Sequence, residues 1–150
     1  QGVFTSLLLD ALRGGCSDLT GNISPGSVYA YVDRALGPWA QRPVFKTNVS
    51  RFVSLRNVAP PIETVVLRNI TKYFASAYDD YKLDPSFEDT EANANPENVK
   101  IFKELQKMEG VGLVKPAGEE HMYYAALNSK SCKLTALGMQ YWNLVTSGNI

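Results

Sequence analysis

The chain has 150 residues, of which 45% are hydrophobic and 20% charged, and fifteen basic side chains balance fifteen acidic ones. This composition is typical of one or two globular domains and excludes a collagen-like or largely disordered protein. No apolar run approaches the roughly 20 residues of a membrane span, so we expect no membrane partner. Zero net charge argues against sequence-independent nucleic-acid binding as the main function of the whole chain.

The charge is unevenly distributed along the sequence. Residues 1–61 carry six basic and three acidic groups, a net of +3, whereas residues 62–150 carry nine basic and twelve acidic groups, a net of −3. Pro60-Pro61 lies at this change, and a proline pair interrupts regular structure. We therefore predict two domains, residues 1–58 and 59–150.

The first domain is predicted to begin with two amphipathic helices. Apolar residues at helical spacing over residues 4–12 predict the first, which Gly14-Gly15 ends. Ser24 as N-cap and Pro25 at the first helical position predict the second, which ends at Gly37.

Two short strands, residues 44–49 and 51–55, are predicted to follow these helices. So few elements bury little apolar surface by themselves. The segment is therefore predicted to be the end of a larger α/β domain.

Four motifs within residues 1–56 resemble the closing third of the caspase-like cysteine peptidases, most closely the metacaspase-like and bacterial branches. They are residues 2–12 (GVFTSLLLDAL), 18–24 (DLTGNIS), 29–32 (YAYV) and 41–44 (QRPV). The resemblance implies an α/β/α sandwich and a histidine–cysteine dyad that cleaves peptide bonds. In such a dyad the imidazole helps to form the thiolate and protonates the leaving amine.

In that family both dyad residues precede the first of these motifs. The resemblance therefore implies a small-subunit-like chain that lacks the dyad and completes the peptidase fold. The chain starts at Gln1 rather than Met and shows no signal peptide. We expect a processed product or an excised fragment, whose partners are a large catalytic subunit, or the upstream segment of the same precursor, and a protein substrate. Free cysteines and the absence of a signal peptide predict a cytoplasmic location.

The second domain is predicted to contain three helices, an acidic loop and a hairpin. Seven acids against one lysine at about residues 79–97 indicate a mobile acidic loop. The other predicted elements are helices at about 62–78, from Pro96 to Gly110 and after the N-cap Thr135, with a turn at 116–120 and a strand at 121–127.

The pattern L-x-x-M-E-G-x-G-L-V…Y-Y…L-T-x-L-G within residues 62–150 resembles winged-helix domains. The resemblance implies an α+β regulatory or interaction module. The acidic loop stands where the family has a second short helix, which weakens the usual DNA-binding interpretation.

Lysines mark the candidate contact site for nucleic acid or a regulatory protein. Lys100, Lys103 and Lys107 recur along the predicted helix, and Lys115 follows it. Such a face can neutralise phosphates, but a solvated helix face explains the same pattern and is favoured. The alternative to the peptidase hypothesis is a non-enzymatic winged-helix protein that binds DNA or another protein.

No catalytic, cofactor or metal site is predicted in this chain. His121 and Cys132 form a conceivable dyad, but no glycine turn or helix start flanks the thiol to activate it. Cys16 is predicted to be an ordinary free thiol. The turn at Asp18 lacks the carboxylates of a calcium loop.

Overall fold

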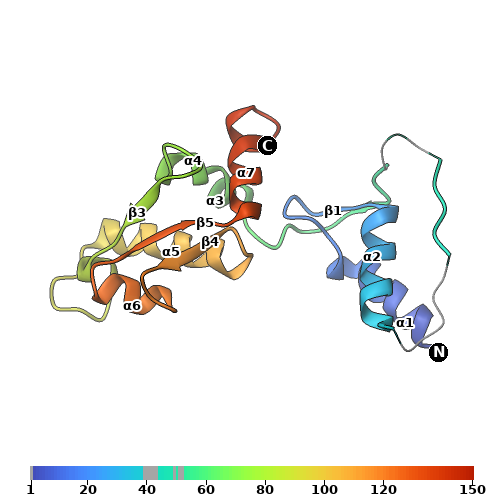
Figure 1. The fold of residues 1–150 in the computed structure, drawn as a ribbon, viewed down its shortest axis with the longest axis horizontal. Coiled ribbons are helices and arrows are strands. Elements are labelled where there is room, and N and C mark those ends of the chain that lie inside the picture. Colours follow the sequence, from blue (N-terminus) through green and yellow to red (C-terminus); the bar gives the residue numbers. More distant parts are fainter. Residues whose placement is uncertain (1, 39–43, 49, 51–52) are drawn as a thin grey trace. The chain divides into compact units, whose positions relative to one another are not determined.

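The computed structural model describes residues 2–38, 44–48, 50 and 53–150, and helices predominate over two small sheets. The chain divides into two compact units, Gln1–Pro61 (unit 1) and Ile62–Ile150 (unit 2). Both units combine helices with short antiparallel strands (Figure 1). The mixed helix and strand content agrees with the predicted combination of both element types.

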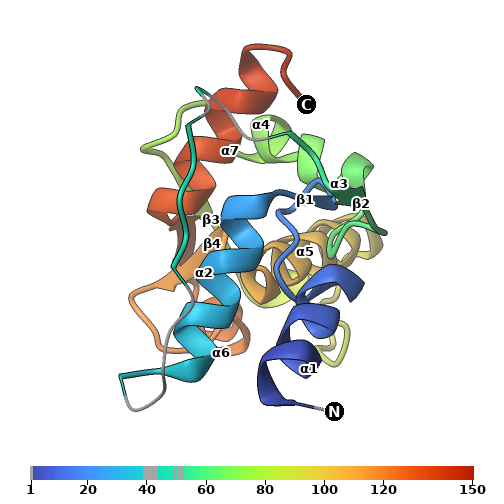
Figure 2. The same cartoon turned by 90° about the vertical axis from the view of Figure 1, so that its right-hand side faces the viewer.

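Unit 1 is a pair of packed helices with a two-residue ladder. Its elements are α1 (Val3–Asp10), the π-helical turn η1 (Ala11–Gly15), β1 (Asn22–Ile23), α2 (Pro25–Leu36) and β2 (Arg56–Asn57). The two helices lie side by side (Figure 2), and β1 pairs antiparallel with β2. Among the described residues of unit 1, four hydrophobic side chains are buried, namely those of Ala11, Ile23, Val28 and Val32. The core that these residues form is therefore small.

Both predicted ends of α2 are confirmed. The Ser24 side chain accepts a hydrogen bond from the Ser27 N–H, and the Ser27 hydroxyl accepts one from the Ser24 N–H. Pro25 occupies the first turn, and Gly37 ends the helix with a φ of 62°. The capping groups satisfy backbone donors that have no partner within the helix.

The prediction of strands at 44–49 and 51–55 is wrong for the described residues of these segments. Residues 44–48, 53 and 54 form no ladder, and Leu55 only donates its N–H to the Ile23 carbonyl at 2.7 Å beside β2. Strand β2 is the only strand that the described residues form in this region. Backbone groups in a strand need a neighbouring strand, and the short β1 pairs only with β2. Residues 49, 51 and 52, and residues 41–43 of the QRPV motif, lie outside the described residues.

Unit 2 packs helices on one face of a three-stranded antiparallel sheet of order β3-β5-β4 (Figure 1). Its fully buried side chains include Phe74, Leu105, Met108 and Leu113. The elements are α3 (Thr64–Arg68), α4 (Ile70–Tyr73), β3 (Asp80–Lys82), η2 (Pro85–Phe87), α5 (Pro96–Gly110), β4 (Val114–Ala117), α6 (Met122–Leu127), β5 (Ser131–Leu134) and α7 (Ala136–Thr146).

The start of α5 at Pro96 and the N-cap Thr135 of α7 are confirmed. The single helix predicted at 62–78 is instead the two short helices α3 and α4, which end at Tyr73. Phe74 is extended there, so its side chain turns into the core while the chain leaves the helix.

The acidic segment at 79–97 is not an unstructured loop. It contains strand β3 and the 3₁₀ turn η2, whose Pro85 follows the N-cap Asp84. Leu83 and Phe87 are buried. The rings of Tyr81 and Phe87 pack edge to face, with their centroids 6.0 Å apart. Apolar side chains interspersed among the acids therefore anchor the segment, which the excess of charge obscured.

The predicted strand at 121–127 is wrong, because Met122–Leu127 form α6. Met122, Ala125 and Ala126 are the buried residues, a spacing of three and four that belongs to a helix. The predicted turn at 116–120 is displaced, since Pro116 and Ala117 belong to β4. Strand β5, which was not predicted from the sequence, is the central strand of the sheet.

Candidate functional site

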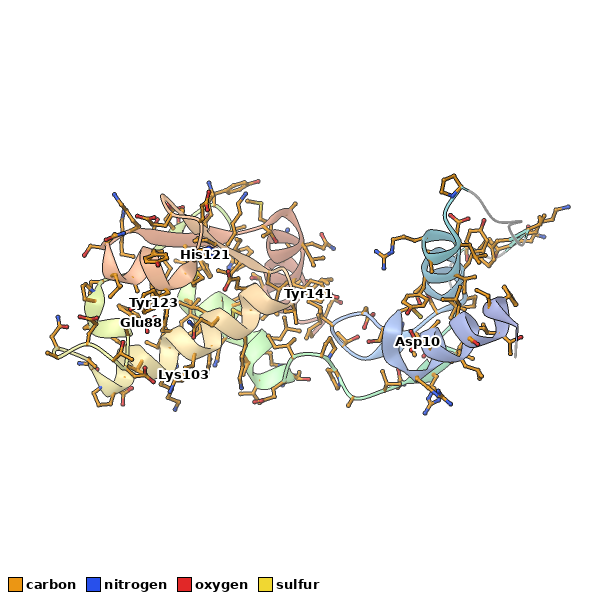
Figure 3. All side chains as sticks on the ribbon, turned by 90° about the horizontal axis from the view of Figure 1, so that it is seen from below. Asp10, Glu88, Lys103, His121, Tyr123 and Tyr141 are labelled. Atoms are coloured by element: carbon orange, nitrogen blue, oxygen red, sulfur yellow. The ribbon has the colours of Figure 1, made fainter. Side chains whose placement is uncertain are left out.

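The three predicted lysines of α5 share its solvent face. The opposite face buries Phe102 and Leu105 in the core. Lys100, Lys103 and Lys107 are exposed, and Figure 3 shows Lys103 projecting away from the helix. The amphipathic pattern predicted for α5 is therefore confirmed.

Acidic groups occupy this lysine face. The Lys103 Nζ lies 3.2 Å from Asp89 Oδ2, and the Lys107 Nζ lies 3.0 Å from Glu63 Oε1. All four side chains are at least half exposed, so each pair contributes little to stability. The two acids neutralise positive charge that would otherwise attract the phosphates of a nucleic acid.

Glu104 lies in the middle of α5 and joins that helix to α3 and α4. Its Oε2 accepts a hydrogen bond of 2.6 Å from the Tyr73 hydroxyl and one of 2.7 Å from Asn69 Nδ2. Burial raises the pKa of the Glu104 carboxyl, but these two bonds and the charges of Lys100 and Lys72 outweigh it and leave the pKa below its ordinary value.

We expect the stabilisation from Glu104 to depend on pH. Because its folded pKa is lowered, this contribution is fully present above the unfolded value near 4.5 and disappears as the pH falls through the folded pKa. Glu104→Gln should therefore lower the free energy of unfolding by about 1–2 kcal/mol at pH 7 and by much less at pH 3. Urea unfolding at both pH values measures this difference. In a Tyr73→Phe background the cost at pH 7 should shrink, and an undiminished cost would contradict the assigned hydrogen bond.

Lys115 does not join the α5 lysines but lies on β4, in the sheet. Its register partner on β5 is Lys133, which is also paired with Asp80 on β3. Directly paired residues of an antiparallel sheet share a face. Lys82, two residues after Asp80, therefore lies on the same face.

Lys82 and Lys133 also belong to this group, although neither was predicted from the sequence. In β5 the buried Cys132 and Leu134 alternate with Lys133, and this alternation was the available signal. It covers only four residues, and the partner strand Asp80–Lys82 lies some fifty residues earlier in the chain.

The thiols are not arranged for nucleophilic catalysis. Cys132 is fully buried, and its burial, together with Asp80 and Glu109, raises its pKa to about 12. It is therefore protonated at neutral pH, whereas His121 is exposed and stacks at a tilt beside Tyr124. Cys16 donates to the Ala11 carbonyl at 3.4 Å. Among the described residues, no hydrogen bond joins a cysteine to the histidine.

The Asp18 turn is built from internal hydrogen bonds. Asp18 Oδ1 accepts from the Thr20 N–H, the Thr20 hydroxyl and the Asn22 N–H at 2.7–3.0 Å. Over the described parts of the chain, no three His, Cys, Asp or Glu side chains gather in a group that could hold a metal ion. None of the helices in those parts has the length and apolarity to cross a bilayer.

Unit 1 exposes an apolar groove on its helix pair. The groove encloses about 270 Å³ and is lined by Phe4, Leu8, Pro25, Val28, Tyr29, Val32, Val44, Phe45 and Leu55. The ring of Phe45 stacks on that of Tyr29 with centroids 4.8 Å apart. Val44 is 81% exposed and Phe4 46%, so much of this apolar lining faces solvent.

The chain matches no known family model, no curated protein and no solved structure.

Proposed function

We propose that this chain is the small-subunit-like C-terminal portion of a caspase-like cysteine endopeptidase. It completes a peptidase fold whose histidine–cysteine dyad lies on an upstream segment or a separate chain, and unit 2 is its winged-helix-like docking module. The observation that carries this proposal is the open apolar groove of unit 1.

The groove supports the proposal because helices of an α/β sandwich bury one face against a sheet. In unit 1, α1 and α2 pack on each other, yet Phe4 and Leu55 remain about half exposed. A contiguous exposed apolar surface marks an interaction site more often than an ordinary surface does. The occupant that fits both this groove and the four motifs is the central sheet of the peptidase.

The order of elements in unit 2 favours a winged-helix-like module. Strand β5 lies between β3 and β4, and α5 directly precedes β4. The 3₁₀ turn η2 lies where the resemblance expects a second short helix. Helix α6 is an insertion between β4 and β5, at the position of the wing.

A protein partner fits this module better than duplex DNA does. Asp89 and Glu63 already neutralise Lys103 and Lys107 on α5. A duplex on this face would also meet Glu104, whose lowered pKa keeps it ionised at neutral pH. Duplex binding with a steep salt dependence, lost in the triple variant Lys100→Glu/Lys103→Glu/Lys107→Glu, would reverse this preference.

The peptidase assignment is tested by intact-mass analysis of native, size-exclusion-purified material. We expect a second chain of peptidase size that contains a histidine and a cysteine alkylated by iodoacetamide in the folded complex. That complex should cleave peptides, and alkylation should abolish the cleavage. A folded chain that elutes alone, with no cleavage and no such companion, would contradict the assignment.

We expect Val44→Lys to weaken this association at least about tenfold, because it places an ammonium group in the apolar groove. Val65→Lys is the matched control, since Val65 is also a highly exposed valine, 69% accessible, but lies on α3 of unit 2. Sedimentation of each variant with the companion chain measures the dissociation constant. Equal weakening by both variants would show that the groove is not the docking surface.

A further inference from the structure

The outer face of the β3-β5-β4 sheet carries a concentration of positive charge. Lys82, Lys115 and Lys133 lie on it together with one acid, Asp80, which gives three positive charges against one negative and a formal sum of +2. All four residues are exposed. The opposite face of the sheet packs Val114, Cys132 and Leu134 into the core, so these lysines have no structural role in that core.

Lys115 and Lys133 stand directly opposite each other on neighbouring strands. Like charges in this arrangement repel and cost stability. Among the described residues neither lysine forms a salt bridge, in contrast to Lys103 and Lys107 on α5. Asp80, the register partner of Lys133 on β3, offsets part of this repulsion. An anion bound between the two ammonium groups would relieve the rest.

A pocket adjoins this lysine pair. It encloses about 340 Å³, and Lys115 and Lys133 line it together with Ala77, Tyr78, Asp80, Leu134, Thr135, Ala136 and Met139. Part of the lining is thus apolar. Tyr78 is 83% exposed, so its ring is available to a ligand.

The acids nearest the pocket already have partners. Asp80 Oδ2 accepts a 2.9 Å hydrogen bond from the Ser131 hydroxyl, and Asp79 Oδ2 accepts one of 3.0 Å from the Ser76 N–H. These bonds hold both carboxylates in place. The sheet face itself keeps its formal sum of +2, because Asp80 is included in that sum.

The charge and the size of the pocket favour a phosphomonoester. At neutral pH such a group carries about −1.5 to −2 charges and presents three acceptor oxygens at one point. A carboxylate supplies only one negative charge against the two ammonium groups of Lys115 and Lys133 that line the pocket. A nucleic-acid backbone spreads single charges along a track, whereas Lys115 and Lys133 line one pocket.

We propose that the Lys115–Lys133 pair on the outer sheet face of unit 2 binds a phosphorylated side chain of a partner protein. This inference rests on the proposed function only in taking unit 2 as a protein-docking module. The apolar part of the pocket lies beside the lysine pair, so an aromatic ring that carries the phosphate fits the same space.

The test uses the full chain labelled with ¹⁵N and titrated with phenyl phosphate at physiological salt. We expect saturable amide shifts at Tyr78, Lys115 and Lys133. Benzoate, which has the same ring but a single charge, should bind about tenfold or more weakly, as should inorganic phosphate, which lacks the ring.

Two double variants of equal charge locate the site. Lys115→Gln/Lys133→Gln should abolish the saturable shifts, since each lysine removed costs about tenfold in affinity. Lys103→Gln/Lys107→Gln removes the same charge from α5 and should leave the affinity nearly unchanged. All four residues are exposed, so both variants should fold, and thermal unfolding checks this.

Absence of saturable shifts with phenyl phosphate overturns the proposal. So do equal affinities for benzoate and phenyl phosphate, equal losses in the two double variants, or tighter Lys115-dependent binding of a short DNA duplex. Failure of the peptidase assignment is a separate result, because it is measured through the companion chain and Val44→Lys. Phenyl phosphate binding without a companion chain would retain this site and discard the peptidase assignment.

Discussion

Gly138→Ala is expected to lower the free energy of unfolding of unit 2 by at least about 3 kcal/mol, a large share of the total for a domain of this size. Gly138 lies in the first turn of α7 and is buried. A Cβ at this position would overlap the carbonyl oxygen of Leu113 and lie 3.0 Å from its carbonyl carbon and 3.2 Å from Leu134 Cβ. These are mainly backbone atoms, so the clash cannot be relieved by rotating a side chain.

The backbone at Leu113 has little freedom to move aside. Its carbonyl accepts the Thr135 N–H at 2.9 Å, and the Thr135 hydroxyl donates to the Gly112 carbonyl at 2.5 Å. The same hydroxyl accepts the Gly138 N–H at 3.0 Å. Displacement of α7 would therefore break its own N-cap together with its contact to the segment that joins α5 to β4.

Gly110→Ala is the matched control for this prediction. Gly110 is the last residue of α5, and an added Cβ meets no atom within 4 Å. Alanine there should be neutral or slightly stabilising, because glycine loses more backbone entropy on folding. Urea unfolding followed by circular dichroism compares the two variants. A Gly138→Ala protein as stable as Gly110→Ala would contradict the close approach of α7 to Leu113.

The helix boundaries that depend on local chemistry were predictable from the sequence. Ser24 with Pro25, and Thr135 before α7, are side chains that satisfy nearby backbone donors, so three or four consecutive residues contain the information. The sequence identifies Gly138 only as the glycine of the L-T-x-L-G pattern. Its physical reason, the close approach to Leu113, required the fold.

Elements that depend on distant partners were not predictable in the same way. Residues 121–127 contain adjacent tyrosines, which favour strands, but their small and apolar residues have a helical spacing. The segment forms a helix, which buries Ala125 and Ala126. Strand β5 is short and becomes a strand because β3 and β4 flank it. The segment at 44–48 has strand-like composition but no ladder partner among the described residues.

The same distinction between local and long-range features applies to the lysines of the candidate site. The sequence indicated that Lys100, Lys103 and Lys107 share a helix face, which is a local property. It did not indicate that Glu63, forty-four residues earlier, would neutralise Lys107. Nor did it indicate that Lys115 would face Lys133 across two strands, since register is a property of the sheet.

The second large effect is expected at Phe74, where alanine should cost about 3–5 kcal/mol. Phe74 has no exposed surface and meets Tyr81 edge to face at 6.2 Å. The Tyr81 ring in turn packs on Phe87, and Phe87 packs on Phe102 of α5, with the centroids of the last two rings 6.3 Å apart. This chain of aromatic rings joins α4, β3, η2 and α5, so removal of its first member leaves a cavity where the acidic segment is anchored.

Substitutions at Phe74 test side-chain packing without changing a backbone hydrogen bond. The Phe74 carbonyl accepts a 2.7 Å hydrogen bond from the Trp142 indole, and alanine keeps that acceptor. Phe74→Leu should therefore cost clearly less than Phe74→Ala, because it retains most of the buried volume. Tyr78→Ala, on an 83% exposed side chain of the same segment, is the control and should change stability by less than about 0.5 kcal/mol. If Phe74→Ala were as mild as Tyr78→Ala, the aromatic chain would not hold the acidic segment, and that segment would behave as the mobile loop that its charge alone predicts.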